Sequence, residues 1–387
     1  MVLKIAAVVV PERWSLLEHR AMRCRRALSI LGVTALVVGL TPSLGADPFQ
    51  GADPLWNLLH EPAVARDLGL TPAQRRQVRG LLDEMDGKFF PLRNQPPASS
   101  LPAADALLAD TMRRLEGMLS PEQLRRITEI RIRQRGPAAL VEPTLAERMH
   151  YTPPQRERLE AVIAETLAAT RDLVKRLSDG EPRQPLDEAY RELKQDELRR
   201  VSGILSPTQR TTWRKALGAD FDLTALGHAV FKAPDLVDSG AWLNSEPLTL
   251  EALAGKVVVV HFYAFSCSNC IRNYPTYVAW QERFRDQDVV ILGVHTPETP
   301  TEEDVERVRQ KAEEAGFRFP VLVDLTKGTW DAWGNSMWPS VYLIDKRGSL
   351  RHFWPGELTW QGATGDAWMQ DRIEELLAEP AAADADR

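Results

Sequence analysis

Hydrophobic residues follow one period in the first part of this chain and another in its last third. In the first part they recur three or four residues apart, as at Val78, Leu81, Leu82 and Met85, which is typical of helices that bury one face. Later, the run GKVVVVHFYAF at 255–265 is continuously β-branched and aromatic, which indicates a strand buried on both faces. The pattern therefore predicts an all-helical region followed by a region built on a sheet.

The helical region, residues 53–218, contains an internal repeat. The segment EPAVARDLGLTPAQRRQVRGLL begins at Glu61 and aligns without a gap with EPTLAERMHYTPPQRERLEAVI, which begins at Glu142. Such self-similarity predicts two copies of one helical unit, at about 61–141 and 142–218.

Each copy carries two [ST]-P-x-Q motifs. Ser or Thr at an N-cap accepts a bond from the third helical amide, Gln reaches back to the cap, and Pro suits the first position. The motif also resembles the Leu-Thr-x-x-Gln elements of small helical envelope proteins of the Spy/CpxP type, which bind misfolded partners. That resemblance implies that the helical repeat binds a protein partner. If the motifs only cap helices, the helical repeat is a scaffold. The four motifs are Thr71–Gln74, Ser120–Gln123, Thr152–Gln155 and Ser206–Gln209.

The N-terminus has the design of a secretory signal. Residues 22–46, MRCRRALSILGVTALVVGLTPSLGA, run from basic to apolar to small side chains; the apolar run is short for a membrane span, and a buried core helix is the alternative. Because Met22 opens this pattern, the residues before it suggest an upstream mis-start. We expect 1–46 to be removed on export, taking Cys24, six basic and two acidic residues and leaving a net charge of −10.

Charge and cysteine content narrow the function. The whole chain has a formal net charge of −6, which disfavours nucleic acid as a partner. Three cysteines are too few for a disulfide-dense scaffold. After export only Cys267 and Cys270 would remain, and we expect no bound cofactor and no metal.

The last third predicts alternating strands and helices after a linker at 219–238. The final residues, 379–387, are predicted to be disordered. The expected elements are the strand and helix around the cysteines, a strand at 288–296, a charged helix from Glu302 to Ala315, a strand at 319–324, a hairpin at 340–356 turning at 346–348, and a helix at 366–378.

Cys267 and Cys270 are best interpreted as a redox couple. As a staple the pair closes a very short loop, worth about 2 kcal/mol in the entropy model. A structural zinc site needs four ligands, and the sequence has no second pair. A helix that begins directly after a strand would place Cys267 at its N-terminus, where free amides lower a thiol pKa. Cys267 is then the nucleophile, and Cys270 resolves the mixed disulfide.

The order of elements, strand–helix–strand and then hairpin–helix, is that of the thioredoxin fold. The sequence resembles the exported TlpA-like and DipZ-like oxidoreductases in WLNSEPLTLEALAGKVVVV, FYAFSCSNCIRNYP, VVILGVHTPE and WPSVYLIDKRG. The resemblance implies an α/β thioredoxin-like domain over 239–378, protein dithiol or disulfide substrates, and a thiol protein as electron donor or acceptor. It places the protein in the periplasm or cell envelope of a bacterium.

The resemblance also marks residues around the cysteines. Pro339 matches the family's cis-proline, and Trp338 before it would touch the substrate or belong to the core. Thioredoxins carry a buried carboxylate six residues before the first cysteine, where this chain has His261, which is either a base for Cys270 or a core histidine.

Two further residues and two exclusions complete the expected site. His295 and Glu298 follow a strand at its carboxyl end, where sites of α/β sheets gather, and are candidates to flank the cysteines. The lone peroxidatic cysteine preceded by Pro and Thr is absent, which disfavours a peroxidase. The C-x-x-C spacing differs from the C-x-x-x-C of copper-chaperone redoxins.

Two functions are therefore predicted. The first is an exported thiol-disulfide oxidoreductase fused to a helical module. The alternative is a non-catalytic envelope binding protein that acts through its helical repeats.

Overall fold

The computed structural model describes residues 55–178, 181–227, 230–237 and 240–380. The predicted signal at 1–46 lies outside the described residues, as does most of the predicted tail at 379–387.

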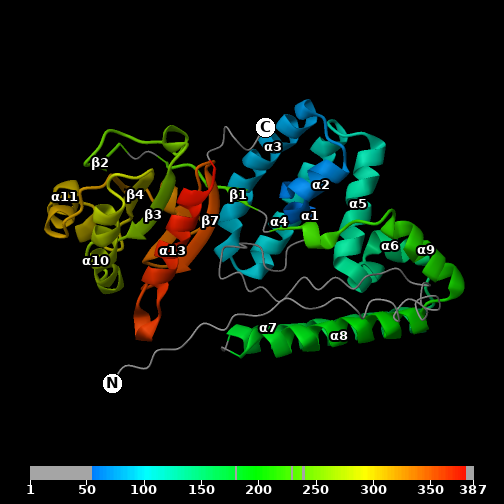
Figure 1. Ribbon diagram of the computed structural model, residues 1–387. Helices are drawn as coiled ribbons and strands as arrows, with labels where there is room; N and C mark the ends of the chain where they lie inside the picture. Colours follow the sequence, from blue (N-terminus) through cyan, green and yellow to red (C-terminus); the bar gives the residue numbers. More distant parts are fainter. Residues whose placement is uncertain (1–54, 179–180, 228–229, 238–239, 381–387) are drawn as a thin grey trace, which may run out of the picture. The chain divides into compact units, whose positions relative to one another are not determined.

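The described chain from Leu55 to Leu217 is helical, and α7 and α8 pack along each other as a hairpin (Figure 1). The predicted face formed by Val78, Leu81, Leu82 and Met85 is buried on α3. The elements are α1 (Leu55–His60), α2 (Pro62–Asp67), α3 (Pro72–Phe89), η1 (Phe90–Asn94), α4 (Pro97–Glu116), α5 (Pro121–Arg135), η2 (Gly136–Val141), α6 (Pro143–Met149), α7 (Pro153–Ser178), α8 (Arg183–Ile204) and α9 (Pro207–Leu217).

The [ST]-P-x-Q motifs start helices, as predicted. Complete capping boxes open α3 at Thr71, α5 at Ser120 and α9 at Ser206. At Thr152 the Gln half forms, with Gln155 Oε1 accepting from the Thr152 amide at 3.1 Å, while the Gln155 amide bonds the Thr152 carbonyl.

The capping glutamines have a second role that the sequence did not reveal. The Gln74 side-chain amide donates to Gln123 Oε1 at 2.9 Å, and Gln155 donates likewise to Gln209 at 3.1 Å. Each of the four side-chain amides also donates to a backbone carbonyl at or just beyond the C-terminal end of another helix. The same interlocked pair therefore ties two helix starts together in each half of the helical region.

A seven-stranded sheet follows, in the order β1-β7-β6-β3-β4-β5-β2. The central strand β3 pairs parallel to β4 and antiparallel to β6, and β6 and β7 form the predicted hairpin. The strands are β1 (Phe231–Lys232), β2 (Trp242–Leu243), β3 (Val257–Tyr263), β4 (Val289–His295), β5 (Val321–Val323), β6 (Ser340–Ile344) and β7 (Ser349–Pro355).

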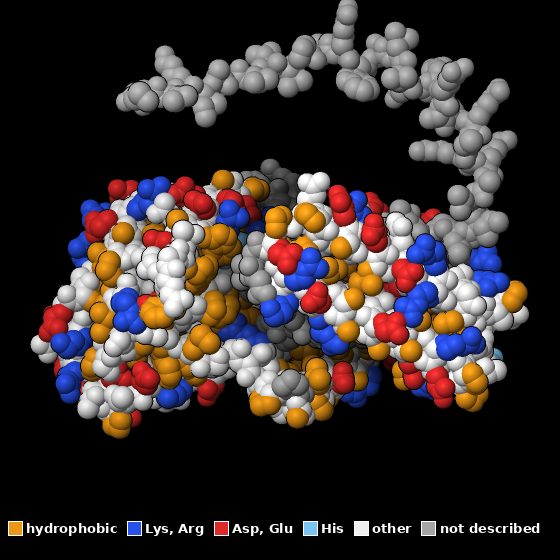
Figure 2. All heavy atoms as spheres, turned by 90° about the horizontal axis from the view of Figure 1, so that it is seen from below, with side chains coloured by type: hydrophobic (Ala, Val, Ile, Leu, Met, Phe, Trp, Pro, Cys, Tyr) orange, Lys and Arg blue, Asp and Glu red, His pale blue; other side chains and the backbone are white. Residues whose placement is uncertain are grey.

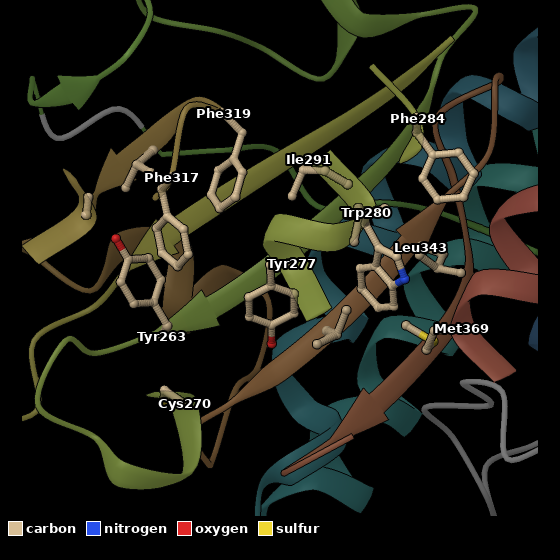
Figure 3. Close-up of a cluster of buried hydrophobic side chains, with 14 of the residues drawn as sticks. Tyr263, Cys270, Tyr277, Trp280, Phe284, Ile291, Phe317, Phe319, Leu343 and Met369 are labelled. Atoms are coloured by element: carbon tan, nitrogen blue, oxygen red, sulfur yellow. The ribbon is translucent and has the colours of Figure 1, made fainter. Parts of the chain in front are cut away.

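Both faces of this sheet are covered, which accounts for the uninterrupted apolar run of β3. Val257 and Val259 pack with residues of α10 (Ser268–Arg283), α11 (Val305–Glu314) and α13 (Gly365–Ala378). Figure 3 shows Tyr277 and Trp280 of α10 within this cluster. On the opposite face Val258 and Val260 pack with tryptophans of and beside α12 (Gly328–Ala332). Short 3-10 turns η3 (Leu223–Ala225), η4 (Glu251–Leu253), η5 (Pro300–Glu302) and η6 (Trp360–Gly362) connect these elements.

Two expectations need correction. The predicted linker at 219–238 contains β1, which pairs with β7 and is too short to stand out in the sequence. The charged helix expected from Glu302 begins only at Val305, because the Asp304 carboxylate caps it by accepting from the amides of the following turn. Glu302 is buried and serves another purpose, described below.

The described helices include none that is long and apolar enough to cross a membrane. On the face seen in Figure 2, basic and acidic side chains are interspersed and do not gather by sign.

Candidate active site

The cysteine pair lies where the central strand turns into a helix. β3 ends at Tyr263, and Cys267 is the N-cap of α10. Its Sγ accepts a hydrogen bond from the Cys270 amide at 3.3 Å. Cys267 is half-buried, whereas Cys270, one turn into the helix, is fully buried. The predicted placement of Cys267 at a helix N-terminus is thus present in the structure.

The two thiols are unequal in acidity. No disulfide joins them; the Cys270 thiol donates a hydrogen bond to Cys267 Sγ, with the sulfur atoms 2.6 Å apart. This bond is the main reason why the pKa of Cys267 falls to about 7; backbone amides help, while burial and the charge of Glu298 oppose the shift. Burial raises the pKa of Cys270 far above its ordinary value. Only the accessible thiol is therefore substantially ionised at neutral pH.

The Trp338–Pro339 peptide bond is cis, as expected from the sequence. Trp338 is half-buried, donates its indole N–H to the Thr296 carbonyl at 3.2 Å and stacks on Trp330 with ring centroids 4.1 Å apart. The Lys327 ammonium lies 5.6 Å from the Trp338 ring centroid. Three contacts therefore hold Trp338 in place.

His261 is a core residue of β3. Its ring is fully buried and stacks on Tyr277 with centroids 4.0 Å apart. Gly293 of β4 gives the ring room, since a Cβ there would come within 3.3 Å of His261 Nε2. Neither ring nitrogen has a hydrogen-bond partner among the described residues. Burial lowers the pKa of His261 to about 3, so the ring is neutral at physiological pH.

His295, at the end of β4, is equally buried. Its ring is stacked with that of Phe265, with centroids 5.6 Å apart, and lies edge-on to Tyr263. Burial lowers its pKa to about 4, partly offset by the charge of Glu302. Its ring nitrogens also lack partners among the described residues. Glu298 is exposed, and its charge acts on both cysteines.

Glu302 is a site residue that the sequence reasoning missed. Its carboxylate accepts from the amide and hydroxyl of Ser266, at 2.8 and 2.6 Å, and from the amides of Glu298 and Thr299, at 2.8 and 2.9 Å. Burial opposes ionisation, but these bonds prevail and lower the pKa of Glu302. The side chain thus ties the turn before Cys267 to the loop that carries Glu298. The Thr299–Glu302 capping pattern was the signal that could have found it.

Two residues after the cysteines were also missed. Arg272 donates to both carboxylate oxygens of Glu357, at 2.5 and 2.7 Å, and to the side-chain oxygen of Asn269. Asn273 is buried; it donates to the Gly356 carbonyl at 3.3 Å and accepts from the Leu358 amide at 2.9 Å. Both side chains fasten the segment after β7 to the first turns of α10.

The family profile and the sequence relatives support the same fold and chemistry. A profile of the AhpC/TSA family matches residues 230–353. Protein DipZ of Mycobacterium tuberculosis is 40% identical over 128 residues, which are 32% of this chain and 18% of DipZ. Thiol-disulfide oxidoreductase YkuV of Bacillus subtilis is 30% identical over 146 residues, which are 38% of this chain and 94% of YkuV. A solved structure of a thioredoxin-like protein in its oxidised form is 30% identical. The match covers 38% of this chain and 95% of the solved chain, with a TM-score of 0.34.

These matches differ in what they cover. The chain spans less than a fifth of DipZ but nearly the whole of YkuV. The resemblance of the helical region to Spy/CpxP-type proteins stays a prediction. Through its C-terminal region, with a thioredoxin-like sheet and a cysteine pair at the start of α10, the chain belongs to the thioredoxin-like thiol-disulfide oxidoreductases.

Proposed function

We propose that the protein is an exported thiol-disulfide oxidoreductase that exchanges disulfides with protein substrates through Cys267 and Cys270. The observation that carries this proposal is the asymmetry of the pair. Cys267 is accessible and has a pKa lowered to about 7 by its bond from Cys270, whereas Cys270 is buried and protonated.

The exchange takes two displacement steps. The Cys267 thiolate attacks one sulfur of a substrate disulfide, which forms a mixed disulfide and releases the other substrate sulfur as a thiolate. Cys270 then loses its proton and attacks the Cys267 sulfur, which releases the second substrate sulfur and closes the Cys267–Cys270 disulfide. Two electrons pass to the substrate, and a partner thiol protein restores the dithiol. The same steps in reverse oxidise a substrate dithiol.

The auxiliary residues have unequal parts in this proposal. A neutral His261 with a strongly lowered pKa is a weak proton acceptor, so we assign it to packing against Tyr277. We assign the cis Trp338–Pro339 segment to contact with the substrate backbone, as the family resemblance implies. Glu298 moderates the acidity of Cys267 through its charge.

A disulfide-reduction assay tests this function. Reduction of insulin disulfides is measured for the wild type, for Cys267→Ala and for the control Val237→Ala, which trims an exposed side chain outside the pair. We expect Cys267→Ala to abolish the activity and Val237→Ala to retain it. Equal rates for the wild type and Cys267→Ala would overturn the proposal.

Export rests on the charge, apolar and small-residue pattern of residues 22–46. Fusing this segment to a phosphatase that is active only outside the cytoplasm should give active enzyme. A fusion that stays inactive, although it is expressed, would remove export from the proposal.

A second function, client binding by the helical region, is favoured by one observation. Leu167 and Val174 of α7 are 51% and 38% exposed and stand seven residues apart, on one face of the helix. If this face binds unfolded clients, replacing both residues with Ser should weaken suppression of client aggregation, while insulin reduction stays unchanged. Undiminished suppression by this variant would leave the helical region with a scaffold role.

A further inference from the structure

A hollow of about 400 Å³ adjoins the cysteine pair. One side is Asn269, which lies between the two cysteines in the sequence. The other side is the end of β7 and the segment that leads from it to α13 (Figure 1), with Trp354, Pro355, Trp360 and Ala363 among the lining residues. A cavity of this size lined by aromatic and aliphatic groups suits an apolar ligand group.

Trp360 stands out on the rim of this hollow. Its side chain is 56% exposed, the largest fraction among the exposed large hydrophobic residues of the described chain. The next residue, Gln361, has a φ of 51°, a left-handed conformation that is costly for a residue other than glycine. Strained backbone of this kind persists where the surrounding structure enforces it, and it gathers at functional sites.

The wall that carries Trp360 is fastened to α10 before any ligand binds. Asn273 holds the Gly356 carbonyl and the Leu358 amide, and Arg272 holds the Glu357 carboxylate through two bonds. The Glu357 carbonyl in turn accepts the indole N–H of Trp354 at 3.1 Å. These bonds preform the hollow, so little ordering is needed on binding.

The same bonds decide the polarity of the hollow. Glu357 is the only acidic lining residue, and its charge is met by the Arg272 guanidinium. No charge among the described lining residues is thus left to attract a cationic side chain. What remains for a ligand is the surface of two tryptophans, a proline and an alanine.

We propose that this hollow is a specificity subsite for an aromatic or large aliphatic side chain that lies a few residues from the reacting cysteine of the substrate. The proposal deepens the proposed function and rests on it. The substrate class is an extended or unfolded polypeptide segment, since aromatic and large aliphatic side chains are mostly buried in folded proteins.

The reach of the mixed disulfide fits this occupant. A disulfide holds two Cα atoms roughly 5.5 Å apart, and each extended residue adds about 3.4 Å. Side chains within about three residues of the substrate cysteine therefore fall beside Cys267. Asn269, two positions from Cys267, belongs to the wall of the hollow. One wall of the hollow thus lies two residues along the chain from the point at which the substrate is covalently held.

Two synthetic peptides test the subsite. Each carries one cysteine joined to glutathione, and the two differ only in having Trp or Ala at the second position after the cysteine. Reduced enzyme converts each into free peptide and free glutathione while its own pair becomes a disulfide. The second-order rate constant is measured for the wild type, Trp360→Ala and the control Val237→Ala, which trims an exposed apolar residue outside the hollow.

We expect the wild type and Val237→Ala to prefer the Trp peptide about tenfold, as burial of one large apolar group allows. Trp360→Ala should lose most of this preference and keep its rate on the Ala peptide. Equal loss on both peptides, or a wild type without preference, would overturn the proposal.

Two other outcomes are distinguishable. If sedimentation shows a wild-type dimer that Trp360→Asp dissociates, the occupant is a second copy of the chain and the subsite is refuted. If the wild type reduces neither peptide, the proposed function itself fails.

Discussion

The carboxylate of Glu302 offers the sharpest perturbation of the turn that carries Cys267. One of its oxygens serves the amide and hydroxyl of Ser266, and the other serves the amides of Glu298 and Thr299. Glu302→Gln keeps the size of the side chain but replaces one acceptor oxygen with an amide nitrogen, which cannot accept these bonds. It also removes the charge.

The expected cost follows from the bonds. A buried N–H left without an acceptor costs about 1–3 kcal/mol, and bonds to a charged partner are stronger than neutral ones. Whichever oxygen is replaced, at least one backbone amide loses its partner. Because Ser266, Glu298 and Thr299 are exposed, water takes up part of this loss. We therefore expect Glu302→Gln to lower the free energy of unfolding at pH 7 by about 1–3 kcal/mol.

The pH dependence has a definite sign. The pKa of Glu302 is lowered in the folded protein, so its charge stabilises the fold at pH values above the unfolded pKa of roughly 4.3. This contribution is lost as the pH falls through the folded pKa. The difference between wild type and Glu302→Gln should thus be constant above about pH 5 and shrink below it.

Urea unfolding, followed by tryptophan fluorescence at several pH values, measures this difference. Glu303→Gln is the matched control, because that neighbouring carboxylate is exposed. Equal stability of wild type and Glu302→Gln at pH 7, or a difference that grows in acid, would refute the reasoning.

Three other predictions follow from the described contacts. Alkylation of Cys267 against pH should show a midpoint near 7, and Cys270→Ala should raise it, because the bond from Cys270 is the main cause of the lowered pKa; an unchanged midpoint would contradict this. The pKa of His261 is about 3 in the folded protein and roughly 6.5 in the unfolded chain. As the pH falls below about 6.5, the unfolded chain therefore takes up a proton on this ring while the folded protein does not. The free energy of unfolding should then fall by up to about 1.4 kcal/mol per pH unit. His261→Leu should reduce the dependence of the free energy of unfolding on pH below about 6.5, measured by urea unfolding. An unchanged pH dependence would contradict a buried, neutral His261 ring. Gln209→Ala should cost about 1–2 kcal/mol through lost capping and clamp bonds, while Gln184→Ala, an exposed glutamine, should cost almost nothing in the same urea assay.

Much of this fold could be predicted because its signals are local. The continuous apolar run at 257–263 marked a strand buried on both faces, and the strand-to-helix change placed Cys267 at an N-cap. The hairpin turn after Ile344 and the Ser/Thr-Pro helix starts also depend on neighbouring residues alone. Such features need no knowledge of distant partners.

The rest depended on contacts between distant residues. β1 has two residues, and its pairing with β7 defines it. Glu302 looked like one charge of an exposed helix, and its bonds to Ser266 become visible only when β3 and β4 lie side by side. Asn273 is one polar residue of α10 whose partners lie beyond β7. Polarity alone does not distinguish such residues from solvated ones.

The central claim is that Cys267 and Cys270 are a two-electron redox couple, and a redox titration tests it most directly. The protein is equilibrated in dithiothreitol buffers of stepped potential, alkylated and digested. The mass of the peptide that carries both cysteines is then measured by mass spectrometry. We expect one transition from doubly alkylated dithiol to unalkylated internal disulfide, with a slope of two electrons. Two cysteines that stay fully alkylated at every potential would contradict the account.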